Sequence, residues 1–220
     1  MSAVRVRQHV NPLSHKYQSS IAAPDWATLF QAPTHPLHLD IGCARGQFLL
    51  EMAQAKPDWN FLGVEIREPL VVRANEVRNE LGLKNLHYLF CNINVSLTTL
   101  LGSQMLAGAT IQFPDPWFKK RHQKRRVAQP ELIQTLAQHI QPDGFLFIQS
   151  DVLDVAEQMR AVISAHPVFQ PSADSAPWMA HNPLPIATER ETGVLSEGKP
   201  VYRCWFTRLA ISQTQSPIMF

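Results

Sequence analysis

The chain has 220 residues, 45% of them hydrophobic, and its 20 Lys/Arg against 18 Asp/Glu give a formal net charge of +2. Such a length and apolar content can bury a substantial core and fit one domain, or one domain with an arm. No apolar run approaches the roughly 18 residues that cross a bilayer, and the first residues lack the apolar region of a signal peptide. The cysteines are odd in number and far apart, without the pairing of a zinc site or a disulfide framework. These observations predict a cytoplasmic protein with no membrane segment and no bound metal.

The beginning of the chain differs in pattern from the rest. Residues 1–36 contain four prolines, basic and polar positions and no sustained hydrophobic period, which predicts an arm laid over the domain. Residues 37–212 alternate short apolar runs with longer segments of helical spacing, as βαβ units do. We assign residues 213–220 to a C-terminal tail.

The predicted elements follow in chain order. Strands are expected over 37–41, 61–65, 86–91, 109–113 and 144–149. Helices are expected over 46–55, 68–82, 130–140 and 152–166, with Gly82 as a C-terminal stop and Pro130 as a first helical residue. Residues 201–211 alternate as a late strand does, antiparallel and at the far side of the sheet. The fold class is therefore α/β, with a mostly parallel, doubly wound sheet.

The segment LDIGCARGQF joins the first strand to the first helix and contains Asp40, Gly42 and Gly46. Glycines let the backbone turn sharply and approach a ligand above a helix N-terminus. Glu65 ends the second strand, nineteen residues after Gly46, where doubly wound folds place an acid that binds ribose hydroxyls. This spacing predicts a nucleoside cofactor, and an ordinary strand-to-helix turn is the alternative.

The glycine pattern also discriminates between cofactors. The dinucleotide fingerprint requires glycines at 44 and 47, where Ala44 and Gln47 stand, so NAD is disfavoured. A carboxylate at 40, two residues before the first glycine, suits a ligand that carries positive charge. S-adenosylmethionine, with its sulfonium and ammonium groups, is such a ligand.

The segment IQFPDPWFKKRHQKRR follows the fourth strand, which should emerge beside the first strand where ligands bind. Pro114 and Pro116 would hold Asp115 in a stiff segment at the mouth of this crevice. Residues 119–126, here called the basic loop, carry six Lys/Arg and no acid, which leaves 14 against 18, or −4, for the rest. An aromatic beside such a cluster matches the splayed base and the phosphates of structured RNA. A solvated loop is the alternative reading.

The residues expected to contact RNA combine this aromatic with the cations that follow it. They are Trp117, Arg121, His122, Lys124, Arg125 and Arg126. The arm adds four further basic groups, Arg5, Arg7, His9 and Lys16.

The segment FPDPWFKKRHQKRR resembles the signature of the tRNA (guanine-N7)-methyltransferases, the TrmB family, and the likeness extends through DIGCARGQF, FLGVEI, FIQSD and TEREtgvlsegKPVYR. The resemblance implies a Rossmann-like, S-adenosylmethionine-dependent enzyme that methylates N7 of a tRNA guanine, the variable-loop guanine at tRNA position 46. It further implies that Asp40, Glu65 and Asp115 line the cofactor site. Four residues would face the guanosine: Lys119, Asp151, Thr188 and Glu191. After the third strand, many members have an acid beside the adenine, whereas this chain offers Asn94, with Asn92 as a neighbour.

The chemistry that this resemblance implies requires little of the protein. Guanine N7 has a lone pair and no proton to lose, so an in-line attack on the methyl carbon needs alignment and fixed charge rather than a base. Asp151 and Asp115 are the catalytic candidates, and Asp151 could accept hydrogen bonds from guanine N1 and N2. The target base would have to leave its stack first.

Other functions stay open at this point. The chain could methylate another RNA or a protein site, act as a nicotinamide-dependent oxidoreductase, or bind nucleic acid with a cofactor pocket that has lost its use. The expected partner is tRNA, and the expected oligomeric state is monomer or homodimer.

Overall fold

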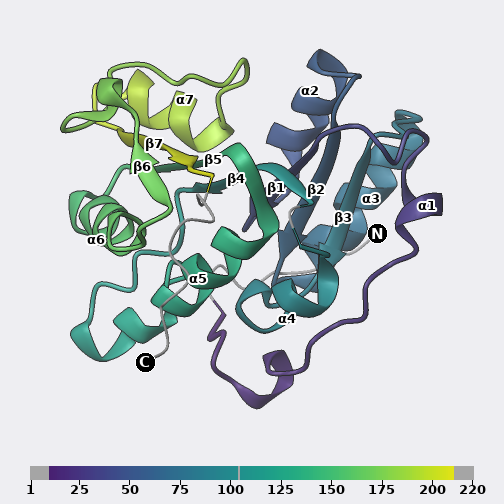
Figure 1. Ribbon diagram of the computed structural model, residues 1–220, viewed down its shortest axis with the longest axis horizontal. Coiled ribbons are helices and arrows are strands. Elements are labelled where there is room, and N and C mark those ends of the chain that lie inside the picture. The colour runs from purple at the N-terminus through teal and green to yellow at the C-terminus, as the bar shows by residue number, and fades with distance from the viewer. Residues whose placement is uncertain (1–9, 104, 211–220) are drawn as a thin grey trace, which may run out of the picture.

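The computed structural model of the chain describes residues 10–103 and 105–210. Seven strands form one sheet in the order β3-β2-β1-β4-β5-β7-β6 (Figure 1). They are β1 (Leu37–Ile41), β2 (Asn60–Glu65), β3 (Leu86–Phe90), β4 (Leu106–Gln112), β5 (Ile140–Ser150), β6 (Phe169–Pro171) and β7 (Tyr202–Arg208). The first five are parallel, and β7 is antiparallel to both β5 and β6. The predicted α/β class and the late antiparallel strand are confirmed, although β6 lies outside β7 at the edge.

Seven α-helices connect or flank the strands of the described chain. They are α1 (Trp26–Leu29), α2 (Gln47–Ala55), α3 (Glu68–Glu80), α4 (Ile93–Leu100), α5 (Pro130–His139), α6 (Leu153–Ser164) and α7 (Glu189–Ser196). The four predicted helices are present, and Pro130 is the first residue of α5. Helices α1, α4 and α7 were not predicted. Both α4 and α7 begin at side-chain caps, because Asn92 Oδ1 accepts from the N–H of Asn94 and Thr188 Oγ1 accepts from the N–H of Glu191.

The helices cover both faces of the sheet. On one face, α4, α5 and α6 pack against the side chains of β1, β4 and β5 that point toward them. On the other face, α2 and α3 enclose a second apolar cluster with β2 and β3. This three-layer arrangement leaves the carboxyl ends of β1 and β4, where the strand order reverses, as the expected ligand site.

The second cluster also fixes the glycine loop. Gly46 has a left-handed backbone, with φ +79°, and a Cβ there would lie 2.6 Å from the ring of Tyr88. The hydroxyl of Tyr88 donates to the carbonyl of Gly46 at 2.6 Å. Only glycine fits at this position, because both the backbone angle and the close ring exclude a side chain.

The described part of the arm, residues 10–36, runs past α4 to α1 (Figure 1). Asn92 Nδ2 donates to the carbonyls of Pro12 and Tyr17, both at 3.1 Å, and Thr99 Oγ1 donates to the carbonyl of Ile21 at 2.9 Å. The arm is thus tied to the α4 region by polar contacts. The predictions that concern Arg5, Arg7, His9 and the tail 213–220 lie outside the described residues.

Candidate active site

A cavity of about 610 Å³ opens above the carboxyl ends of the parallel strands. Its size lies within the range of small-molecule sites. The predicted site residues that line it are Asp40, Gly42, Glu65, Asn92, Asn94, Asp115, Arg125, Asp151 and Thr188. Gly46 shapes the loop without lining the cavity, and Val10 and Pro12 of the arm also line it. Residues from most of the chain therefore meet at one place.

Asp40, at the end of β1, is a buried carboxylate with a defined set of donors. Thr110 Oγ1 donates to Oδ1 at 2.6 Å, and Gln112 Nε2 donates to the same oxygen at 3.3 Å. Burial raises the pKa of Asp40 to about 6 against the opposing effect of these hydrogen bonds, and the charge of Glu65 adds to the rise. Asp40 therefore carries its negative charge at neutral pH and loses it in mild acid.

A buried histidine contacts Thr110, one of the two donors to Asp40. His38 Nε2 lies 3.0 Å from Thr110 Oγ1, and burial lowers the pKa of His38 to about 3. The ring is therefore neutral, and because the threonine hydroxyl donates to Asp40, its oxygen accepts from the Nε2 proton. The chain His38–Thr110–Asp40 fixes the direction of all three groups.

Glu65, at the end of β2, accepts hydrogen bonds from both sides of the loop. The N–H of Ala44 donates to Oε2 at 3.0 Å, and Arg67 contacts both carboxylate oxygens through Nε and Nη2, each at 2.9 Å. Ala44 is in the left-handed region, with φ 50°, which directs its N–H toward the acid. Asp40 and Glu65, two of the three acids predicted for the cofactor site, thus line one cavity.

The two asparagines after β3 differ in their environment. Both polar atoms of the buried Asn92 side chain are used, since Nδ2 binds the arm and Oδ1 caps α4. Asn94 lines the same cavity and is exposed. The amide available to a ligand is therefore that of Asn94.

The exit from β4 combines proline with unusual backbone angles. Phe113 and Trp117 have φ of 48° and 43°, which are uncommon for aromatic residues and concentrate at functional sites. Between them Asp115 is half-buried and lines the cavity. The stiffness expected of this segment is thus accompanied by strain on both sides of the carboxylate.

The aromatic residue most open to a ligand is Phe118 rather than Trp117. Trp117 is half-buried, with the guanidinium of Arg125 5.0 Å from its ring centroid and the His122 ring perpendicular to it at a centroid distance of 5.8 Å. Phe118 is 71% exposed and lines the cavity. Phe118 was not predicted as a site residue, although its place between a stiff segment and a basic run was the available signal.

The basic loop forms a short 3-10 helix, Lys120–Arg125, beside the cavity. Lys119, Arg121 and Lys124 are exposed, but Lys119 is not among the cavity-lining residues. Arg125 lines the cavity, and its Nε has no hydrogen-bond partner among the described residues. The loop therefore presents several cations next to the opening.

Arg126 departs from the expected phosphate contact. Its side chain is 3% exposed, donates from Nε to the carbonyl of Pro116 at 2.9 Å and forms an ion pair with Asp154. These contacts tie the FPDPW segment to α6. A residue so enclosed holds the loop in place and is not available to a phosphate.

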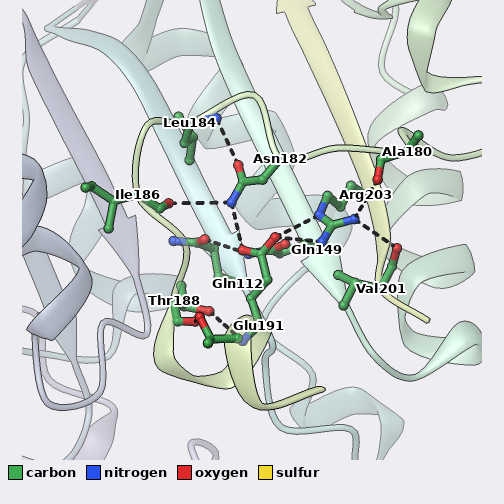
Figure 2. Close-up of polar contacts among 11 residues, drawn as sticks. Gln112, Gln149, Ala180, Asn182, Leu184, Ile186, Thr188, Glu191, Val201 and Arg203 are labelled. Carbon is green, nitrogen blue, oxygen red and sulfur yellow. Dashed lines mark hydrogen bonds and ion pairs between the residues drawn. The ribbon is translucent and has the colours of Figure 1, made fainter. Parts of the chain in front are cut away.

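Thr188 and Glu191, the first and last residues of the predicted substrate motif, have different positions (Figure 2). Thr188 caps α7 and lines the cavity. Glu191 is buried and absent from the described cavity lining, and its oxygens accept from Arg203, Asn182 and Gln149. Asp151 lines the cavity and pairs with Arg190 at 2.5 Å. Glu191 was expected to face the substrate, whereas its side chain is enclosed in the protein.

The buried network continues from Glu191 to the cofactor side of the site. Gln149 Nε2 donates to Glu191 Oε2 at 3.0 Å and to Gln112 Oε1 at 2.8 Å, and Gln112 in turn donates to Asp40. Figure 2 shows Gln112 from β4 and Gln149 from β5 next to Glu191 of α7. The roles of Gln112, Gln149 and Arg203 were not predicted, because no local sequence pattern marks a polar strand residue as buried.

A doubly wound sheet with a carboxylate-lined cavity at the switch point places the chain in the Rossmann-like methyltransferase fold class. Solved structures agree: the aminoglycoside resistance methyltransferase NpmB1 has a TM-score of 0.54 at 13% identity, covering 84% of this chain and 91% of that one. The cyclase SpnF has a TM-score of 0.55 at 14% identity, covering 85% and 79%. Because one of these is named a cyclase, the fold alone does not specify a reaction.

Sequence relatives define the family more narrowly. A family model described as "Putative methyltransferase" matches residues 34–204. A protein of Trichormus variabilis named tRNA (guanine-N(7)-)-methyltransferase is 55% identical over 210 residues, covering 94% of this chain and 97% of its own. A protein of Synechocystis sp. with the same name is also 55% identical, covering 94% and 99%. The chain belongs to the tRNA (guanine-N7)-methyltransferase family.

No helix within residues 10–103 and 105–210 is long and apolar enough to cross a membrane. In the same part of the chain, no group of three His, Cys, Asp or Glu side chains could hold a metal ion.

Proposed function

We propose that this chain transfers a methyl group from S-adenosylmethionine to N7 of a guanine in tRNA, the guanine of the variable loop. The observation that carries the proposal is the meeting of two buried carboxylates and an exposed cationic loop at one cavity. Relatives of more than half identity that cover nearly the whole chain carry the corresponding name.

The cavity residues fit the cofactor in charge and shape. Asp40 and Glu65 provide negative charge for a ligand with sulfonium and ammonium groups, and Glu65 is placed for ribose hydroxyls. Gly42 has φ +80°, and a Cβ there would meet nothing within 4 Å, so its backbone borders open space. Asn94, which is exposed in the cavity, is our candidate for the adenine side.

The protein then has to align guanine N7 with the methyl group and stabilise the charge that develops on the purine ring. In the reaction, the bond from sulfur to methyl breaks as the bond to N7 forms, and the positive charge moves from the sulfonium to the purine ring. Asp151 and Asp115 lie on the cavity wall where fixed negative charge stabilises that ring. Thr188, at the start of α7, offers a further polar contact to the base.

The RNA side of the site rests on the basic loop. Lys119, Arg121 and Lys124 are exposed and Arg125 lines the cavity, which suits phosphates that flank a displaced base. We assign Arg126 and Glu191 to holding this frame, since their charged groups are buried in ion pairs.

The proposal is tested by incubating unmodified tRNA with the protein and labelled S-adenosylmethionine, followed by nucleoside analysis and mapping of the modified position. We expect 7-methylguanosine in the variable loop. Label in another nucleoside, or on protein, would replace this function with another methyl transfer. Absence of cofactor binding would reject the class.

Cofactor binding should depend on pH through Asp40. A cationic ligand binds the ionised form of Asp40, and the pKa of this group is about 6. The affinity for S-adenosylmethionine should therefore fall about tenfold between pH 7.5 and pH 5, as the ionised fraction falls. The effect of Asp40 on folding stability without ligand has the opposite sign. The folded state holds the proton more tightly than the unfolded chain, so the contribution of Asp40 to the free energy of unfolding decreases as pH rises from about 4 to 6.

Calorimetric titration across this range measures the effect, with Asp40→Asn as the control. The variant should bind weakly and with little dependence on pH, because its amide does not titrate. No histidine is among the described residues that line the cavity. The same pH dependence in wild type and variant would assign the effect to another group.

Phe118 should provide a stacking surface for the displaced base. Base–aromatic stacking contributes about 1–3 kcal/mol, so Phe118→Ala should lower kcat/KM for tRNA about tenfold and leave cofactor binding unchanged. Phe118→Tyr should keep most of the activity, and Val72→Ala, which alters an exposed side chain on α3, is the matched control. Full activity of Phe118→Ala would remove the ring from the RNA site.

A further inference from the structure

The carboxylate of Glu65 has more donors than it can accept while also binding a cofactor ribose. Oε1 accepts from the N–H groups of Ile66 at 2.9 Å and Arg67 at 3.0 Å and from Arg67 Nε at 2.9 Å. Oε2 accepts from the N–H of Ala44 at 3.0 Å and from Arg67 Nη2 at 2.9 Å. A carboxylate has about four lone-pair positions. Five donors leave no acceptor for two ribose hydroxyls.

Only one of these donor groups can move without changing the fold. Three of the five donors are backbone N–H groups, fixed by the turn after β2 and by the left-handed conformation of Ala44. The other two belong to the Arg67 guanidinium, whose side chain is 23% exposed and lines the cavity. The guanidinium is therefore the group that a ribose would displace.

We propose that the guanidinium of Arg67 occupies Glu65 until the cofactor displaces it, and that the displaced guanidinium then serves the RNA side of the site. We call this arrangement the Arg67 latch. The inference rests on the proposed function. Without cofactor, the guanidinium pairs with the buried carboxylate. When ribose hydroxyls take its two positions, it turns toward Asp115 at the cavity mouth, where it can contact a phosphate of the bound tRNA.

Both positions of the cation are electrostatically supported. An unpaired carboxylate that is only 3% exposed is costly, so Glu65 retains a partner when no cofactor is bound. The pKa of Arg67 is raised by its hydrogen bonds to Glu65 and, to a smaller extent, by the charges of Glu65 and Asp115. Because Asp115 acts on the same cation, the displaced guanidinium keeps an acidic neighbour.

Such a latch couples the two ligands. When the cofactor moves Arg67 toward the cavity mouth, the affinity of the protein for RNA rises. By linkage, bound RNA raises the affinity for the cofactor by the same factor. S-adenosylhomocysteine is the suitable probe, because it carries the ribose and does not react. In the wild type, it should increase tRNA affinity about fivefold.

The test compares the wild type with Arg67→Met, which removes the guanidinium and keeps most of the aliphatic stem. Arg67→Met should bind S-adenosylhomocysteine about fivefold more tightly in calorimetry and should lose the coupling to tRNA. The control is Arg73→Met on α3, the helix that begins directly after Arg67, where the side chain is 62% exposed, and it should bind as the wild type does. Unchanged or weaker binding by Arg67→Met overturns the latch, as does a wild-type tRNA affinity that S-adenosylhomocysteine leaves unchanged.

Failure of the latch is distinguishable from failure of the proposed function. A wild type that does not bind S-adenosylhomocysteine contradicts the proposed function itself. If the wild type binds S-adenosylhomocysteine and Arg67→Met binds it no more tightly, only the latch is contradicted. If Arg67→Met does not fold, Arg67→Lys replaces it: an ammonium cannot contact both oxygens as a fork does, so tighter cofactor binding is again expected, and its absence overturns the latch.

Discussion

Replacing Arg203 with methionine is expected to lower the free energy of unfolding by about 3–5 kcal/mol, because it leaves the Glu191 carboxylate buried without its cation. The two side chains are 4% and 1% exposed, and Arg203 Nε and Nη2 lie 3.0 Å and 2.6 Å from Glu191 Oε1. For a chain of this size, such a loss corresponds to a fall in Tm on the order of 10 °C. Denaturant titration and scanning calorimetry measure both quantities.

Two companion variants separate the buried charge from the loss of a side chain. Arg73→Met breaks an exposed pair, in which the partners are 62% and 54% exposed, and should cost at most about 1 kcal/mol. Adding Glu191→Gln to Arg203→Met should recover a large part of the loss, because it removes the unpaired charge. Equal stability of Arg203→Met and Arg73→Met would show that this ion pair does not stabilise the frame of α7.

Asp151→Asn is expected to reduce kcat for tRNA methylation about 100-fold and to leave cofactor affinity unchanged. Loss of one pre-organised group that stabilises developing charge costs about 100- to 1000-fold. Asp151 lines the cavity with 16% of its side chain exposed and is oriented by Arg190. Asparagine keeps the shape but not the charge, so the loss should fall on the chemical step.

Single-turnover methylation with saturating cofactor and tRNA isolates this step. Asp143→Asn is the matched control, since Asp143 is an exposed acid near the start of β5, the strand that Asp151 directly follows, and its variant should be fully active. A single-turnover rate for Asp151→Asn equal to that of wild type would exclude Asp151 from charge stabilisation. A loss confined to cofactor affinity would move it to the cofactor side.

Much of the framework could be predicted because its causes are local in the chain. Strand β1 occupies the predicted residues 37–41, and α5 begins at Pro130. The positive φ of Gly42 and Gly46 agrees with the sharp turn expected of the glycine loop. Hydrophobic period and turn chemistry act over a few neighbouring residues, so they are present in the sequence before any long-range contact forms.

Side-chain exposure, in contrast, was decided only in the folded chain. Trp117 and Phe118 are adjacent aromatics, yet packing by Arg125 and His122 leaves Phe118 as the open one. Arg126 resembles its neighbours in the basic loop but is enclosed by an ion pair with Asp154, 28 residues away.

Glu191 follows the same rule. Its motif with Thr188 predicted a residue that faces the substrate, whereas α7 turns its carboxylate toward Arg203 on β7 and Gln149 on β5. The sequence by itself determined the strands, the glycine loop and the chemical types of the site residues. Only the tertiary structure decided which charges line the cavity and which pair with each other, because burial depends on segments that are distant in the chain and come together on folding.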